Sequence, residues 1–279
     1  MTDAAVRVHS AKVTSQGITE HVRTIPAEVP VAFVYDSTTH AVMMASPTDL
    51  EDFAVGFSLA EGIIGTPEDI QSLDIVEQDR GIELRAWLVP DRGRNLAQRR
   101  RNLAGPTGCG LCGVESLDAA VPSCPRVAAD MTITAADIAA AQAALERAQV
   151  LNRHTRAVHG AGFWTRAKGL VAIAEDVGRH NALDKLFGRL RRNRLQTADG
   201  IVLLTSRVSV EMVQKAAVAG APIIVAMSAP TTLALQTANG AGITLVAVAR
   251  ADGFEVFTHP HRIADVSVAK RKDAVEDAA

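Results

Sequence analysis

The 279-residue sequence is poor in cysteine and in aromatic residues, with three cysteines and 4 % Phe, Trp and Tyr. Three cysteines cannot build the disulfide framework of a small secreted domain, and an odd number argues against secretion. Residues 1–13 lack the apolar stretch of a signal peptide, and no run of about 20 apolar residues is present to span a bilayer. We therefore expect a cytoplasmic protein with no membrane segment.

The sequence also lacks an excess of charge of one sign. Its formal net charge is −2, with 48 % hydrophobic and 22 % charged residues, which suits a globular protein and gives no polycationic surface for nucleic acid. It contains no GxxxxGK[ST] loop, no GxGxxG between a strand and a helix, and no histidine-x-glutamate pair. ATPases, dinucleotide-dependent oxidoreductases and zinc deaminases are therefore disfavoured.

What the sequence does have is a pair of cysteines in a glycine-rich segment, the cysteine arm (residues 99–117). Cys109 and Cys112 form a Cys-Gly-Leu-Cys unit between Gly108 and Gly113, and Arg99–Arg101 precede it. Because glycine disfavours both helix and strand, we expect a mobile thiol that solvent can reach. Neighbouring positive charge favours the reactive thiolate. The pattern therefore predicts a reactive cysteine.

Three other interpretations of the cysteine pair stay open. A structural zinc site needs four ligands, whereas only Cys124 remains and the eight histidines are scattered. A thioredoxin-like dithiol follows a strand and opens a helix, a setting that the flanking glycines disfavour. The last interpretation is a loop that holds two thiols without any chemistry.

The N-terminal part of the sequence predicts a small α+β unit. Residues 1–45 have β-type patterning. A helix is expected from about Asp49 to Glu61, where apolar residues recur on one face, and a short helix from Thr66. The segment that follows predicts a hairpin turning at Arg80-Gly81.

The C-terminal part predicts an α/β layered domain. A helix from Thr134 to Val150, capped by Thr134 and Asp137, precedes a hairpin at 162–176 and a helix at 180–193. From Gly200 onward, apolar strands alternate with helices. The strands are expected at 201–206, 222–229 and 243–250, and the helices at 209–219 and 231–239. Apolar strands between helices are typical of parallel strands buried on both faces.

Ligands of such sheets bind beyond the carboxyl ends of the strands. The sequence places Thr205–Arg207, Ser228–Thr231 and Arg250 there. Two of these ends lead into helix N-termini, whose free N–H groups favour an anion such as a phosphate. The alternative is plain helix capping by Ser206, Ser209 and Thr231.

Other polar segments also have two interpretations. The segment Glu175–Asn181 holds two acids, an arginine and a histidine at a strand-to-helix junction, where they could perform acid–base chemistry or form a capping and salt-bridge cluster. His159 is expected to be a satisfied hydrogen-bonding residue. The segment Phe257–Arg262 could clasp a phosphate-bearing ligand or form an ordinary polar turn.

Taken together, these motifs resemble a known family. The chain is similar to the FdhD/NarQ family of formate dehydrogenase accessory sulfurtransferases. The matching segments follow the family order and cover most of residues 30–262. They are 47–64 (PTDLEDFAVGFSLAEGII), 109–117 (CGLCGVESL), 175–185 (EDVGRHNALDK), 206–223 (SRVSVEMVQKAAVAGAPI) and 228–234 (SAPTTLA).

The resemblance implies a function and its residues. Family members take sulfur from a cysteine desulfurase as a cysteine persulfide and deliver it to the molybdenum (or tungsten) bis(molybdopterin guanine dinucleotide) cofactor, which formate dehydrogenase needs for activity. By this resemblance Cys109 is the persulfide carrier and Cys112 its helper or relay partner. The family's cofactor-binding segment corresponds to Phe257, Thr258, His259, Pro260, His261 and Arg262.

The resemblance also implies an architecture. We expect an α/β fold whose larger C-terminal domain is cytidine-deaminase-like, without the deaminase zinc or any other tightly bound metal ion. The expected division is a small α+β domain (1–130) ending in the cysteine arm, an α/β domain with the cofactor cradle (131–268), and a disordered tail (269–279). A homodimer is expected. The alternative function is a chaperone that holds the cofactor without sulfur chemistry.

Overall fold

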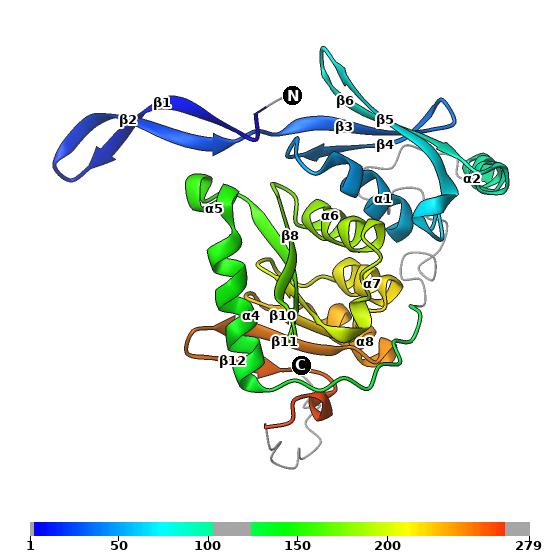
Figure 1. Cartoon of the computed structure of the whole chain (residues 1–279). Coiled ribbons are helices and arrows are strands. Elements are labelled where there is room, and N and C mark those ends of the chain that lie inside the picture. The colour runs from blue at the N-terminus through cyan, green and yellow to red at the C-terminus, as the bar shows by residue number, and fades with distance from the viewer. Residues whose placement is uncertain (1–2, 103–123, 266–279) are drawn as a thin grey trace, which may run out of the picture.

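The computed structural model describes residues 3–102 and 124–265, whose strands form three sheets (Figure 1). The strands are β1 (Ala5–Thr14), β2 (Gly17–Pro26), β3 (Val29–Tyr35), β4 (Thr38–Ala45), β5 (Ile70–Gln78), β6 (Gly81–Leu88), β7 (His159–Thr165), β8 (Gly169–Asp176), β9 (Ile201–Leu204), β10 (Ile223–Ala226), β11 (Thr244–Arg250) and β12 (Gly253–Val256). The helices are α1 (Leu50–Ala60), α2 (Pro90–Asn102), α4 (Ala135–Ala148), α5 (Val150–Thr155), α6 (Arg179–Arg192), α7 (Val210–Ala219) and α8 (Thr232–Ala241). Within these ranges, every helix is too short or too polar to cross a membrane.

The four-stranded sheet of the N-terminal part has the order β4-β3-β6-β5, with β3 and β6 parallel. Helix α1 packs on it through buried aromatic rings, among which Phe33 and Phe57 stack with their centroids 3.9 Å apart. The predicted hairpin is confirmed as β5 and β6. Gly81, where β6 begins, has a φ of +154°, and a Cβ there would lie 2.3 Å from the carbonyl oxygen of Pro30. Only glycine fits where the hairpin passes β3.

Strands β1 and β2 form a ribbon that pairs with no other strand in the described part of the chain. Figure 1 shows this ribbon extending away from the two larger sheets. Val13 and Ile18 at its far end are 71 % and 73 % exposed. The β-type pattern predicted strands here, but not that they would leave the body of the protein. Because a two-stranded ribbon gains little stability alone, it adds little to the folded core.

The six-stranded sheet of the C-terminal part has the order β12-β11-β10-β9-β7-β8. Strands β9, β10 and β11 are parallel, as their apolar sequences predict, and all four residues of β9 and of β10 are buried. Strands β7, β8 and β12 add antiparallel pairs at the two sides. The prediction of an α/β fold with a parallel-containing sheet is therefore confirmed.

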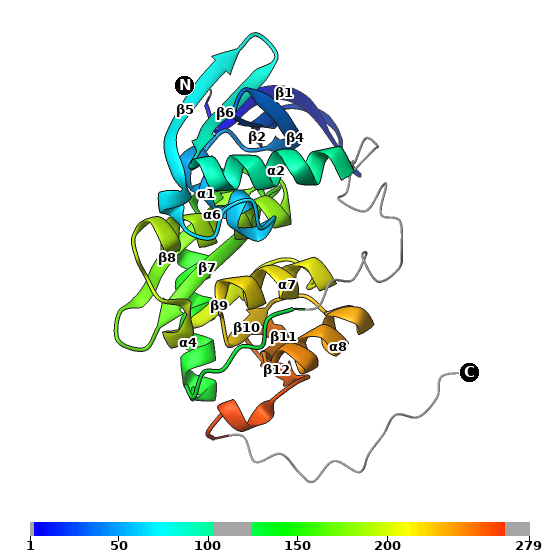
Figure 2. The same ribbon diagram turned by 90° about the vertical axis from the view of Figure 1, so that its right-hand side faces the viewer.

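Helices cover both faces of this sheet (Figures 1 and 2). Helices α6, α7 and α8 bury one set of apolar side chains against one face, and α4 buries Ile138, Ala141 and Leu145 against the other. Helix α4 starts as predicted, because the Thr134 hydroxyl accepts from the backbone N–H of Asp137 while the Asp137 carboxylate accepts from that of Thr134. This reciprocal capping box fixes the start of the helix.

The two larger sheets are joined through helices α1 and α6, which cross at two glycines. A Cβ on Gly56 would lie 1.8 Å from the carbonyl oxygen of Asp184, and one on Gly188 would lie 1.8 Å from that of Asp52. Arg189 and Arg192 of α6 pair with acids on and just before α1, including Asp52. The crossing therefore combines backbone contact with an ion-pair network.

Helix α2 occupies a segment in which no helix was expected from the sequence. It starts at Pro90, a residue favoured in the first turn, and Asp91 places a negative charge near its positive N-terminal end. The arginines that precede the cysteine pair therefore belong to a helix.

Candidate functional site

The predicted sulfur-carrying residues, Cys109 and Cys112, lie outside the described residues, as does the predicted tail at 269–279. Cys124 is the one cysteine within the described ranges, where it packs, half-buried, against the C-terminal core. Burial raises the pKa of its thiol. A thiol that resists ionisation is a poor nucleophile, so this environment does not favour sulfur chemistry at Cys124.

The segment predicted to bind the cofactor, Phe257–Arg262, divides into inward and outward residues. The Thr258 hydroxyl donates to the carbonyl of Ile243 and accepts from the N–H of Leu245, and it is buried. Arg262 is only 7 % exposed, and its guanidinium donates to the backbone carbonyls of Gly242 and Ala129. Thr258 and Arg262 therefore hold the chain together from inside.

The two histidines of this segment remain nearer the surface. His259 has a left-handed backbone with φ 46°, and its Nε2 lies 2.9 Å from the carbonyl oxygen of Asn239. The ring of His261, which is exposed, lies edge-on to it with centroids 5.8 Å apart. The assignment of 257–262 to a cofactor stays a prediction, and these rings are its residues best placed to meet a ligand.

Within the junction Glu175–Asn181, Asp176 forms a fully buried ion pair with Lys185 of α6, with Oδ2 and Nζ 2.5 Å apart. Asp176 also accepts from the backbone N–H of Ser46 and from the side-chain amide of Asn181, and Lys185 donates to the carbonyl of Ser46. These bonds join the C-terminal part to the end of β4. Because a buried charge is tolerated only when it is paired and hydrogen-bonded, both side chains are committed to structure.

Glu175 also has a structural role. Its carboxylate accepts hydrogen bonds from the backbone N–H groups of Leu151 and Asn152, in the first turn of α5. The capping and salt-bridge interpretation therefore holds for Glu175, Asp176 and Asn181. This interpretation does not account for Arg179 or His180.

Arg179 and His180 lie in a second group, the α6–α7 polar cluster (His159, Arg179, His180 and Glu211), whose members interact electrostatically. The sheet brings them together, because Asp176 at the end of β8 pairs with His159 and Thr205 after β9 bonds to the backbone of Gly160. Helices α6 and α7 start directly beyond these strand ends. The sequence analysis did not single out Glu211, although it lies in the first turn of the helix that follows the apolar strand β9, two residues after the N-cap residue Ser209.

Burial and positive charge keep both histidines of the cluster neutral. Burial, followed by the charges of Arg179 and Lys215, lowers the pKa of His180 from 6.5 to about 4. Burial and Arg179 also lower the pKa of His159, while Asp176 opposes them. Burial raises the pKa of Glu211, but the Ser209 hydroxyl, its own backbone N–H and the charges of His180 and Arg179 outweigh this and leave it lowered. At neutral pH the cluster carries one arginine and one carboxylate.

The N-termini of α7 and α8, the two helices that follow parallel strands, differ in whether helix capping accounts for their polar residues. Thr231 caps α8, since its hydroxyl accepts from the N–H of Ala234 at 3.3 Å. At α7 the Ser209 side chain makes no such capping bond. Capping by the residue before the helix therefore applies to α8, whereas at α7 the carboxylate of Glu211 accepts from its own backbone N–H.

The depressed pKa of His180 predicts a pH-dependent stability. Since the unfolded chain takes up a proton near pH 6.5 and the folded chain only near 4, His180 contributes stability above pH 6.5 that is lost as the pH falls toward 4. As the pH falls from 6.5 to 4, we expect the unfolding free energy of wild type to fall by about 2 kcal/mol more than that of His180→Gln. Urea unfolding at several pH values measures it. The exposed His154→Gln is the control, and equal slopes for wild type and His180→Gln would contradict the assignment.

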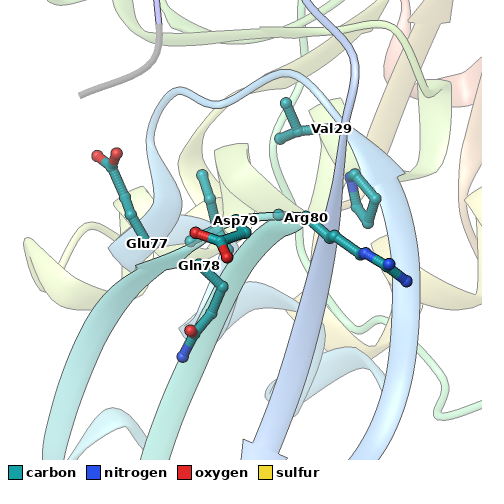
Figure 3. Close-up of a pocket in the computed structure, with 8 residues that line it drawn as sticks. Val29, Glu77, Gln78, Asp79 and Arg80 are labelled. Carbon is teal, nitrogen blue, oxygen red and sulfur yellow. The ribbon is translucent and has the colours of Figure 1, made fainter.

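Two concavities lie apart from the predicted residues. One, of about 280 Å³, lies at the β5–β6 turn, and Figure 3 shows the side chains of Glu77, Gln78 and Arg80 pointing in different directions rather than toward one centre. The other, of about 220 Å³, is a largely apolar hollow between α1, α6 and α7 with Arg191 and Lys215 in its lining. The described part of the chain contains no group of three or more His, Cys, Asp or Glu residues that could hold a metal ion.

Comparison with known proteins identifies the family. The model of the FdhD/NarQ family matches residues 26–264. The sulfur carrier protein FdhD of Agrobacterium fabrum is 54 % identical over 86 % of this chain and 89 % of its own length, and that of Brucella abortus is 50 % identical over 92 % and 96 %. A crystal structure described as a putative formate dehydrogenase accessory protein from Desulfotalea psychrophila superimposes with a TM-score of 0.75 at 26 % identity, covering 94 % of this chain and all of the other. The chain belongs to the FdhD/NarQ family.

Proposed function

We propose that this chain is a sulfurtransferase that carries sulfur as a persulfide on Cys109 and delivers it to molybdenum bis(molybdopterin guanine dinucleotide) for formate dehydrogenase. The observation that carries the proposal is the similarity over most of its length to proteins named sulfur carriers, across a match that includes the Cys109–Cys112 pair. The name of the similar crystal structure supports formate dehydrogenase as the client. A cytoplasmic location and a homodimer complete the proposal.

The chemistry asks for a nucleophilic thiolate at Cys109. The thiolate attacks the outer sulfur of a persulfide on a cysteine desulfurase, the donor's S–S bond breaks, and the donor cysteine leaves as a thiolate. Cys112 can then take the outer sulfur from Cys109 by the same exchange, which regenerates the Cys109 thiolate. The cationic residues of α2 precede this pair in sequence, and positive charge lowers a thiol pKa.

The acceptor is large and carries two pyrophosphates. Backbone N–H groups at helix N-termini and arginine side chains are the groups expected to hold it. The surface rings of His259 and His261 are the described features that support such a cradle. The protein's own residues bind the acceptor and carry the sulfur received from the donor, and the metal belongs to the cargo.

Sulfur loading tests the proposal directly. After incubation with a cysteine desulfurase and free cysteine, we expect the intact chain to gain the mass of one sulfur atom, located on Cys109 by peptide mass spectrometry and removed by a thiol reductant. The Cys109→Ala variant should gain none. Cofactor binding without any mass gain would favour the chaperone alternative, and stoichiometric zinc in the purified chain would favour a structural metal site.

A further inference from the structure

The β1–β2 ribbon has an apolar face that is open to solvent. Val13 pairs with Ile18 across the ribbon, and Val22 lies four residues further along the same strand as Ile18, so all three side chains share one face. They are 71 %, 73 % and 41 % exposed. A two-stranded ribbon is only marginally stable by itself and gains stability when such a face packs on another element. The face is therefore suited to docking.

The surface that covers this face comes from outside the chain. The two strands stay in register over ten consecutive residue pairs without a bulge, which gives the ribbon a reach of about 30 Å. Figure 1 shows it running away from the two larger sheets. Its far end, where Val13 and Ile18 lie, therefore projects to where a partner molecule can meet it.

A second apolar surface lies on the four-stranded sheet, on the face opposite to helix α1. Ala41 and Met43 of β4 pack on the core beneath α1. Val42 and Met44 alternate with them and so point the other way, where they are 58 % and 49 % exposed, and Trp87 of β6 is 48 % exposed. Exposed apolar residues gathered on one face are typical of interaction sites. We call Val42, Met44 and Trp87 the outer sheet face.

The ribbon and the sheet that carries this face have opposite charge. The charged residues of the ribbon, histidines aside, are three cations and one acid, namely Arg7, Lys12, Arg23 and Glu20. The β5–β6 hairpin, which forms half of the sheet, has four acids and two arginines, namely Asp74, Glu77, Asp79, Glu83, Arg80 and Arg85. Opposite charge favours association of a ribbon with a sheet, whereas two ribbons would repel each other.

We infer that the β1–β2 ribbon of one copy packs its apolar face on the outer sheet face of a second copy, which returns the contact with its own ribbon. Each copy then contributes the same two surfaces, so the contact is isologous and closes at two copies. Both exposed apolar surfaces are covered by this one exchange. The number of copies rests on the proposed function, whereas the choice of surfaces rests on the structure.

The oligomeric state of the full-length chain tests the inference. Sedimentation velocity at micromolar concentration is expected to show a dimer for wild type. Ile18→Lys on the ribbon and Val42→Glu on the sheet each place an unpaired charge in the contact, so each should weaken dimerisation about tenfold or more. Val218→Lys is the control, because Val218 is 44 % exposed on helix α7, away from both surfaces, and this variant should remain a dimer.

Mixing the two weakened variants separates this exchange from any other dimer. In a mixed pair, the introduced lysine of one copy meets the introduced glutamate of the other, and the remaining contact is wild type on both sides. We therefore expect two largely monomeric samples to form dimers when they are combined. Val13→Lys with Met44→Glu is a second pair on the same two surfaces, for use if a variant of the first pair fails to fold by circular dichroism.

Three results would overturn the inference. They are a monomeric wild type, folded ribbon or sheet variants that dimerise like wild type, and a mixture of weakened variants that stays monomeric. Sulfur loading on Cys109 is measured separately by mass. Loading of a monomeric wild type would refute only this exchange, and a dimer of the inferred kind that takes up no sulfur would refute only the proposed sulfur chemistry.

Discussion

Replacing Cys109 by alanine is expected to reduce formate dehydrogenase activity to background in a strain that depends on this chain for activation. Alanine has no thiol, so no persulfide can form and no other described cysteine substitutes for it, since the thiol of Cys124 is half-buried with a raised pKa. The measurement is formate oxidation in extracts, with the amount of formate dehydrogenase protein checked by immunoblot.

Two controls make this result specific. Cys124→Ala should retain full activation, because its thiol packs against the core rather than serving as a nucleophile. The melting temperature of purified Cys109→Ala should equal that of wild type, since the glycine-rich sequence around Cys109 is not expected to form part of the core. Wild-type activation by Cys109→Ala would eliminate this cysteine as the carrier.

The parts of the fold that local sequence physics controls were predictable. Continuous apolar runs around Ile201, Ile223 and Thr244, each short and separated by a helical pattern, identified the parallel strands, because strands buried on both faces have such runs. The capping box of Thr134 and Asp137 located the start of α4, because its partners are three residues apart. Each of these signals lies within one short segment.

The features that depend on distant segments were not predictable. The sequence analysis interprets Arg262 as part of a clasp for a phosphate-bearing ligand. In the structure its guanidinium donates to the carbonyl of Ala129, which is far away in sequence. Lys185 lies on a helix that also carries other charged residues. Only the fold shows that the Asp176 carboxylate neutralises it and that it also donates to the carbonyl of Ser46. The cluster of Arg179 with Glu211 likewise needs two strands to end side by side.

Gly188→Ala is expected to destabilise the fold strongly, because Gly188 lies where helices α1 and α6 cross. A Cβ at this position would lie 1.8 Å from the carbonyl oxygen of Asp52, a distance that no carbon and oxygen can adopt without covalent bonding. The helices must therefore separate, which disturbs the buried contacts between them and the ion pairs of Arg189. We expect a loss of about 3 kcal/mol of unfolding free energy.

Thermal unfolding measures this loss, which should lower Tm by roughly 10 °C in a chain of this size. Gly240→Ala is the matched control, because Gly240 lies within helix α8 and a Cβ added there would have no atom within 4 Å. Alanine favours the helix by up to about 1 kcal/mol over glycine, so this control should melt at or above the wild-type temperature. If Gly188→Ala has the same Tm as Gly240→Ala, helices α1 and α6 do not meet at the glycines. The contact between the two larger sheets is then held by the ion pairs instead.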